Sequence, residues 1–116
     1  IVSLHCPATP ETIGMISREA IGRMKRGAIL VNTARGELVD EMALVEALKS
    51  GALAAAGLDV LRNEPVTEHP LFSLSNVVVT PHIAWLTPET LARSIDVAIE
   101  NCRRVGAGET LLHRVV

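Results

Sequence analysis

Short runs of apolar residues alternate along the chain with longer segments in which apolar positions recur at a helical period. The apolar runs predict four strands, which are Ile1–His5, Ala28–Asn32, Ala54–Val60 and Val77–Thr80. Their apolar positions are consecutive rather than alternating, which is typical of strands covered on both faces in a parallel sheet. Strands separated by helices imply right-handed crossovers, so the predicted fold class is α/β with about four parallel strands and flanking helices.

The helical segments between these strands begin at residues that can cap a helix. We expect helices from Ser17 to about Arg26, from Asp40 to Ser50 and from Thr87 to about Arg104, with a short helical turn after Thr9. The longest of them carries an apolar stripe of Leu91, Ile95, Ile99 and Cys102.

Composition removes several classes of function. A length of 116 residues, 48% of them hydrophobic, suits one globular domain at most. A net charge of −2 without a basic cluster argues against a nucleic-acid partner, and no apolar run is long enough to cross a membrane. Two cysteines, Cys6 and Cys102, are too few for a disulfide scaffold, which favours a reducing, cytoplasmic compartment. We expect no metal site.

Candidate binding residues, most of them polar, follow all four predicted strands, at the sheet edge where parallel sheets bind their ligands. They are His5 and Pro7 after the first strand, Thr33, Ala34 and Arg35 after the second, Asp59 and Glu64 after the third, and His82 after the fourth. A guanidinium suits a carboxylate or phosphate, and a carboxylate beside a histidine orients the imidazole and favours its protonated form. Each residue alone is also a common surface residue. Together they predict an acid–base site that binds an anion.

The segments that carry these residues resemble the D-2-hydroxyacid dehydrogenases. The matching segments are Leu4-His5-Cys6-Pro7 with Thr9-Pro10-Glu11-Thr12, Val31-Asn32-Thr33-Ala34-Arg35-Gly36, Gly57-Leu58-Asp59-Val60 with Glu64-Pro65, and Thr80-Pro81-His82-Ile83. They follow one another in the family's order over nearly the whole chain. His82-Ile83-Ala84-Trp85 is most similar to the glycerate dehydrogenase/hydroxypyruvate reductase branch. The resemblance implies the second half of a Rossmann-like doubly wound parallel sheet.

The resemblance also implies an NAD(P)-dependent oxidoreductase that transfers hydride between a nicotinamide and a small 2-keto or 2-hydroxy acid. It implies that Arg35 binds the substrate carboxylate, that His82 exchanges a proton with the keto oxygen, and that Glu64 holds His82. The implied cofactor-binding residues are His5, Pro7, Thr33, Ala34, Arg35, Asp59 and His82, with Asp59 on the nicotinamide carboxamide. Trp85 either covers the sheet or narrows the substrate pocket. His69 and His113 match no motif, so we expect both at the surface.

A glycine-rich turn that would hold the cofactor phosphates is missing from this sequence. Only Gly106-Ala107-Gly108 has the spacing of its first two glycines, and Leu111 stands at the third. In the family that turn precedes the matched segments. The resemblance therefore implies a partial NAD-binding domain at residues 1–86, and at residues 87–116 a helix and tail that return to a missing substrate domain.

Three expectations follow from this partial match. Residues 1–116 alone should be inactive, and the sequence does not choose between NAD and NADP. The edge of the strand at Ile1–His5 should pair with another chain, giving a homodimer or edge-strand association. The alternative to a dehydrogenase is a corepressor-type or otherwise non-catalytic NAD-binding relative, because such relatives carry the same motifs.

Overall fold

The computed structural model describes residues 1–115 and contains two compact units, Ile1–Ile83 and a second that begins at Ala84. The first unit contains, in order, β1 (Val2–Leu4), α1 (Arg18–Gly22), β2 (Ala28–Asn32), the 3₁₀ helix η1 (Gly36–Leu38), α2 (Glu41–Lys49), β3 (Leu53–Leu58), the 3₁₀ helix η2 (Pro70–Ser73) and β4 (Val77–Val79). The second unit contains α3 (Pro88–Ala107).

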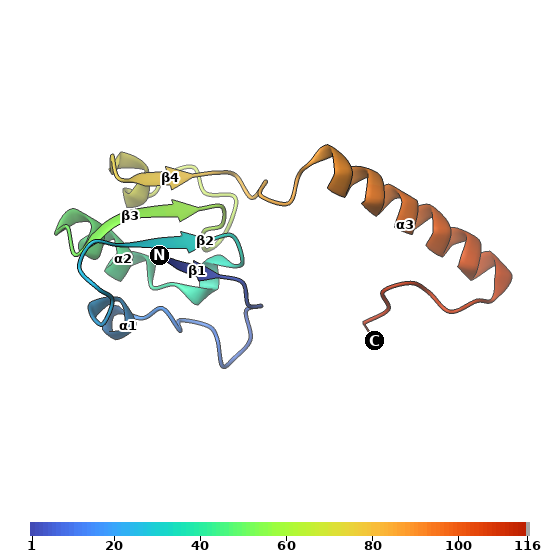
Figure 1. Ribbon diagram of the computed structural model, residues 1–116, viewed down its shortest axis with the longest axis horizontal. Coiled ribbons are helices and arrows are strands. Elements are labelled where there is room, and N and C mark those ends of the chain that lie inside the picture. Colours follow the sequence, from blue (N-terminus) through green and yellow to red (C-terminus); the bar gives the residue numbers. More distant parts are fainter. Residues whose placement is uncertain (116) are drawn as a thin grey trace. The chain divides into compact units, whose positions relative to one another are not determined.

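The four strands form one parallel sheet in the order β1-β2-β3-β4, which confirms the predicted α/β class (Figure 1). Their register aligns four residues in one row across the sheet, namely Leu4, Asn32, Leu58 and Val79. Because all strands run the same way, the segments that follow this row leave the sheet at one edge. That edge is where the predicted site residues of the first unit lie.

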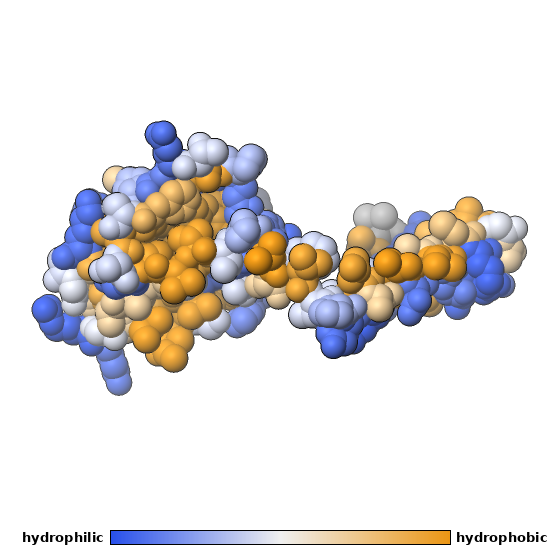
Figure 2. All heavy atoms as spheres, turned by 90° about the horizontal axis from the view of Figure 1, so that it is seen from above, coloured by the Kyte–Doolittle hydropathy of each residue, from blue (hydrophilic) through white to orange (hydrophobic). Residues whose placement is uncertain are grey.

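The core lies on the face of the sheet against which α2 packs. Alternate strand residues such as Leu30, Ala56 and Leu58 are buried on it, and α1 packs against α2. Burying each leucine stabilises the fold by about 1.5–3 kcal/mol. Val78 in β4, by contrast, is 68% exposed. The prediction of strands covered on both faces is therefore wrong for this strand, and Figure 2 shows a broad apolar area on the first unit.

The predicted helix starts are confirmed, but two of the predicted ends are wrong. The side chains of Ser17, Asp40 and Thr87 accept hydrogen bonds from the backbones of Ala20, Ala43 and Thr90. Helix α1 ends at Gly22 instead of near Arg26, and the N–H of Met24 bonds to the carbonyl of Ile21 in a tighter turn. Helix α3 continues to Ala107, where Gly108 adopts a left-handed φ of 68°. The predicted short helical turn after Thr9 is confirmed, because the N–H groups of Thr12 and Ile13 both bond to the carbonyl of Thr9.

The second unit consists of α3 and the segment that follows it. The predicted apolar stripe lies along α3 and is exposed, as the row of apolar side chains in Figure 2 shows. Asn101 exchanges two hydrogen bonds with the backbone of Leu112, so the tail folds back along the helix. Val116 lies outside the described residues. Within residues 1–115, no helix combines the length and apolar character needed to cross a membrane.

Candidate active site

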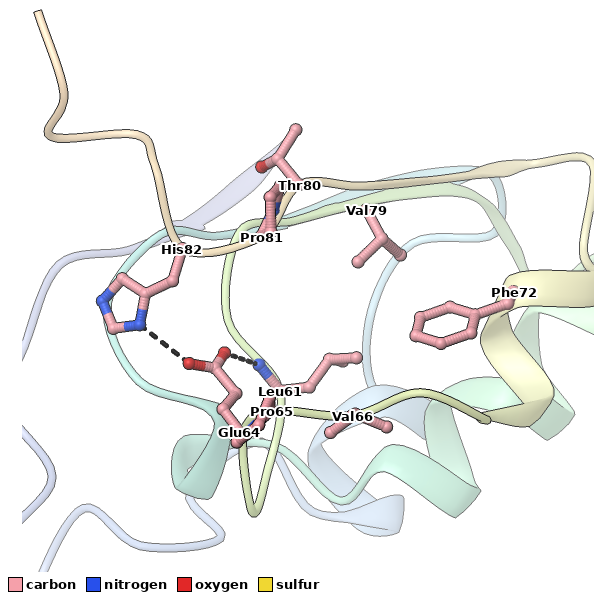
Figure 3. Close-up of a pocket in the computed structure, with 9 residues that line it drawn as sticks. All are labelled: Leu61, Glu64, Pro65, Val66, Phe72, Val79, Thr80, Pro81 and His82. Carbon is pink, nitrogen blue, oxygen red and sulfur yellow. Dashed lines mark hydrogen bonds and ion pairs between the residues drawn. The ribbon is translucent and has the colours of Figure 1, made fainter.

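Glu64 and His82 form a hydrogen-bonded pair at the carboxyl edge of the sheet (Figure 3). Oε2 of Glu64 lies 2.8 Å from Nδ1 of His82, while Oε1 accepts the backbone N–H of Leu61 at 2.7 Å. Both carboxylate oxygens are therefore engaged, which fixes the plane of the carboxylate and the direction of the imidazole. The side chains are 32% and 43% exposed, so the pair is open to a ligand.

His82 occupies an unusual backbone conformation that Asp59 supports. Its φ is 56°, in the left-handed region that side chains other than glycine enter rarely. The His82 N–H donates to the Asp59 carbonyl at 2.8 Å, and Oδ1 of the same aspartate accepts the N–H of Ile83 and the hydroxyl of Thr80. Asp59 is buried, and these bonds hold the turn that presents the imidazole.

Arg35 lies on the turn after β2, and the side chain of Asn32 holds this turn through two hydrogen bonds. The buried Asn32 side chain accepts the N–H of Ala34 at 3.0 Å and donates to the carbonyl of Arg35 at 2.8 Å. This pattern closes the turn, as asparagine side chains commonly do. The exposed Arg35 guanidinium donates from Nη1 to the carbonyl of Ala34.

The next residue, Gly36, brings the Arg35 turn against the segment that carries Glu64. A Cβ at Gly36 would stand 2.2 Å from the carbonyl carbon of Leu61 and 2.5 Å from the nitrogen of Arg62. Only glycine permits this approach of two backbones. The turn after β2 and the segment after β3 are therefore in direct contact.

This contact brings the three predicted catalytic residues together. Arg35, Glu64 and His82 line one shallow hollow. Glu64 and His82 also line a second, mostly apolar cavity of about 540 Å³, whose other walls are Leu61, Pro65, Val66, Phe72, Val79, Thr80 and Pro81 (Figure 3). The arrangement places a cation for an anionic group beside an acid–base pair, next to apolar surface.

Comparisons with known proteins place this geometry in a family. Residues 1–84 match the family model described as D-isomer specific 2-hydroxyacid dehydrogenase, NAD binding domain. The chain belongs to this family. Membership of the D-2-hydroxyacid dehydrogenases thus explains the parallel sheet and the order of the motifs along its edge.

The similarity extends over most of the chain but over only part of each relative. The chain is 52% identical over 108 residues to the D-3-phosphoglycerate dehydrogenase of Mycobacterium leprae, which covers 93% of the chain and 20% of that protein. It is 46% identical over 102 residues to the hydroxypyruvate reductase of Blautia hydrogenotrophica, covering 87% and 32%. A crystal structure of the TT0316 protein of Thermus thermophilus superposes with a TM-score of 0.93 at 52% identity, covering 99% and 37%. The chain therefore spans between a fifth and about two fifths of these proteins.

The residues predicted for the D-2-hydroxyacid dehydrogenase cofactor lie along the same edge. His5 and Thr33 directly follow the aligned row of strand residues, and both are exposed. His5 is hydrogen-bonded to Ser3 at 2.8 Å, and the Pro7 carbonyl accepts the hydroxyl of Thr12. Doubly wound sheets bind dinucleotides at this edge, where the resemblance implies that His5 and Pro7 lie beside the adenosine half of the cofactor and Thr33 beside its nicotinamide. Their roles remain predictions.

Other sequence interpretations need revision. Trp85 belongs to the second unit, where its side chain is 53% exposed, and its role in a substrate pocket stays a prediction. His69 was expected at the surface, which is wrong: its side chain is 14% exposed and lies 3.2 Å from a Glu41 oxygen. Sequence reasoning assigned no role to Asn32 or Thr80. The signal for Asn32 was a polar residue ending an otherwise apolar strand.

Proposed function

We propose that this chain supplies the catalytic edge of an NAD(P)-dependent D-2-hydroxyacid dehydrogenase, which interconverts a small 2-keto acid and the corresponding 2-hydroxy acid. The observation that carries the proposal is the hydrogen-bonded His82–Glu64 pair, which lines one hollow together with Arg35. A 2-keto acid carries a carboxylate next to a carbonyl, so its carboxylate can bind Arg35 while its carbonyl oxygen faces His82.

Each of the three residues has one task in this reaction. The Arg35 guanidinium binds the substrate carboxylate, which fixes the carbonyl relative to His82. Since Nδ1 of His82 is held by Glu64, we assign proton exchange to Nε2. In reduction His82 donates that proton to the keto oxygen, and in oxidation it accepts the hydroxyl proton. Glu64 keeps the imidazole oriented and offsets its positive charge.

The bound nicotinamide supplies the hydride in reduction and takes it in oxidation. Thr33, Ala34 and Asp59 are the residues of this chain that we propose to lie beside it. Ala34 and Asp59 already make internal hydrogen bonds, through the N–H of Ala34 and through Oδ1 of Asp59. Those bonds hold the two turns in place, so we infer that this part of the site is largely formed before the cofactor binds.

Hydroxypyruvate and glyoxylate are the substrates we propose to test first. The name of the Blautia hydrogenotrophica relative supports the former, and the pairing of one guanidinium with one imidazole suits any small 2-keto acid. We propose that Trp85 narrows the pocket. A Trp85→Ala variant should then gain activity on bulkier 2-keto acids relative to hydroxypyruvate, and an unchanged preference would contradict that role.

The decisive experiment uses the complete reading frame that contains residues 1–116. The purified protein should oxidise NADH or NADPH when hydroxypyruvate or glyoxylate is added, and His82→Gln should lower kcat by about 10²–10⁴-fold, the usual contribution of general acid–base catalysis. Binding of the nicotinamide without turnover would instead support the corepressor-type alternative. Unchanged turnover in His82→Gln would overturn the assignment of the proton donor.

Residues 1–116 expressed alone should show no such activity, because the sequence contains no glycine-rich turn for the cofactor phosphates. Saturable reduction of hydroxypyruvate by the purified chain would contradict this expectation.

A further inference from the structure

Glu41, the first residue of α2, joins the two ends of the segment that carries Glu64. Oε1 of Glu41 accepts the backbone N–H of Arg62 at 2.7 Å, at the start of that segment. Its Oε2 lies 3.2 Å from Nε2 of His69, at the end of the segment. The two side chains are 13% and 14% exposed, whereas those of the Arg18–Glu46 pair, which joins α1 to α2, are 57–62% exposed. A shielded contact of this kind is screened much less by solvent than a surface ion pair.

The hydrogen bonds of His69 define how this link works. Nδ1 of His69 accepts the backbone N–H of Leu71 at 3.2 Å, which caps η2. Nδ1 therefore carries no hydrogen in this arrangement, so the hydrogen lies on Nε2, the atom that faces Oε2 of Glu41 at 3.2 Å. Leu71 is fully buried in the core. The far end of the segment is thus fastened to the core through η2 and to α2 through Glu41.

Between these two anchors lies the residue that orients His82. Residues 62–65, 67 and 68 are exposed and Val66 packs against the core, so core packing holds this segment at one point only. The N–H groups of Leu61 and Arg62 are accepted by different carboxylates, Glu64 and Glu41. Movement of the Arg62 backbone would therefore displace the neighbouring bond between Leu61 and Glu64.

We propose that Glu41 is a positioning residue, which acts through the segment 62–69 to hold Glu64 in the orientation that aligns His82, and that His69 completes the link. The catalytic part of this inference rests on the proposed function. The structural part rests only on the contacts of Glu41 and His69 described above. Glu41 lines neither the hollow nor the apolar cavity beside His82, so it acts without touching substrate.

Three variants distinguish loss of the Glu41 contacts with Arg62 and His69 from a general loss of stability. Glu41→Gln keeps the size of the side chain but has one oxygen instead of two, so it cannot both accept the Arg62 N–H and present a second, charged oxygen to Nε2 of His69. His69→Asn retains an acceptor that can cap η2 but is too short to reach Glu41. Glu46→Gln on the same helix is the matched control, since it removes only the exposed contact with Arg18.

The structural test uses residues 1–116 and amide hydrogen exchange, with nitrogen NMR of the His82 ring. We expect the Leu61 amide to exchange about tenfold faster in Glu41→Gln and His69→Asn, the size expected for losing one hydrogen bond, with core amides such as Leu30 unchanged. The ring signature of Nδ1 bonded to Glu64 should weaken in parallel. Glu46→Gln should match the wild type. Loss of protection at Arg62 alone, with Leu61 and the His82 ring unchanged, would overturn the proposal.

The catalytic test uses the complete protein. Glu41→Gln should lower kcat by about tenfold while the KM for the 2-keto acid stays within about twofold, because Arg35 still binds the carboxylate. Equal kcat in the wild type and Glu41→Gln would overturn the catalytic consequence. A wild type without activity would contradict the proposed function, and the exchange experiment would then decide whether the link exists.

Discussion

Gly36 is the position at which one added methyl group should most directly disturb the candidate site. In Gly36→Ala the new Cβ would stand 2.2 Å from the carbonyl carbon of Leu61, whereas ordinary contact begins near 3.4 Å. The two backbones would have to separate by more than 1 Å. Because the atoms met belong to the backbone, no change of rotamer relieves the contact.

We expect Gly36→Ala to lower the free energy of unfolding by about 3 kcal/mol, the upper end of the usual cost of overpacking. For a unit of this size each kcal/mol corresponds to a fall of about 4–8 °C in Tm, so the midpoint of thermal unfolding followed by circular dichroism should fall by about 12–24 °C. The substitution should also separate Arg35 from Glu64 and lower kcat/KM in the complete protein.

Two other glycines supply matched controls. A Cβ at Gly57 in β3 would meet only a Val31 methyl at 4.0 Å, and one at Gly22 in α1 would meet nothing within 4 Å. Gly57→Ala and Gly22→Ala should therefore each change stability by less than about 1 kcal/mol. A Gly36→Ala protein as stable as Gly57→Ala would refute the reasoning.

Three further predictions concern single side chains. Asn32→Ala should cost about 1–3 kcal/mol in urea unfolding, because the N–H of Ala34 and the carbonyl of Arg35 lose their partner, and an unchanged midpoint would contradict that role. Asp59→Ala should cost about 2–4 kcal/mol and release the turn at His82, whereas Thr80→Val removes a single bond to Asp59 and should cost less than half as much. Hydrogen bonds from Arg103 and Arg104 lower the pKa of Glu100 from its ordinary 4.5 to about 2. A lowered carboxyl pKa stabilises the fold above pH 4.5 and loses that effect as the pH falls toward 2. The helical signal of α3 should therefore decline over this range in the wild type but not in Glu100→Gln, and identical acid titrations would refute the assignment.

The sequence predicted much of the fold because the signals it used are local. Strand β2 was predicted at its observed bounds, since its five residues form an apolar run between a glycine and a polar turn. The caps at Ser17, Asp40 and Thr87 were predicted because a cap depends on one side chain and the backbone a few residues later. The end of α1 was not predicted, because it depends on which residues find a partner in the core.

For the candidate site too, some features were predictable from the sequence and others were not. That Arg35, Glu64 and His82 follow strand ends is readable from the chain, and a parallel sheet brings strand ends to one edge. Only the tertiary structure decided that Gly36 lets two backbones meet, that buried Asp59 supports a left-handed His82, and that Glu41 and His69 hold the segment around Glu64. Each of these contacts joins residues more than 20 positions apart. No local pattern encodes such a contact, because its energy depends on burial and geometry that exist only once the sheet has formed.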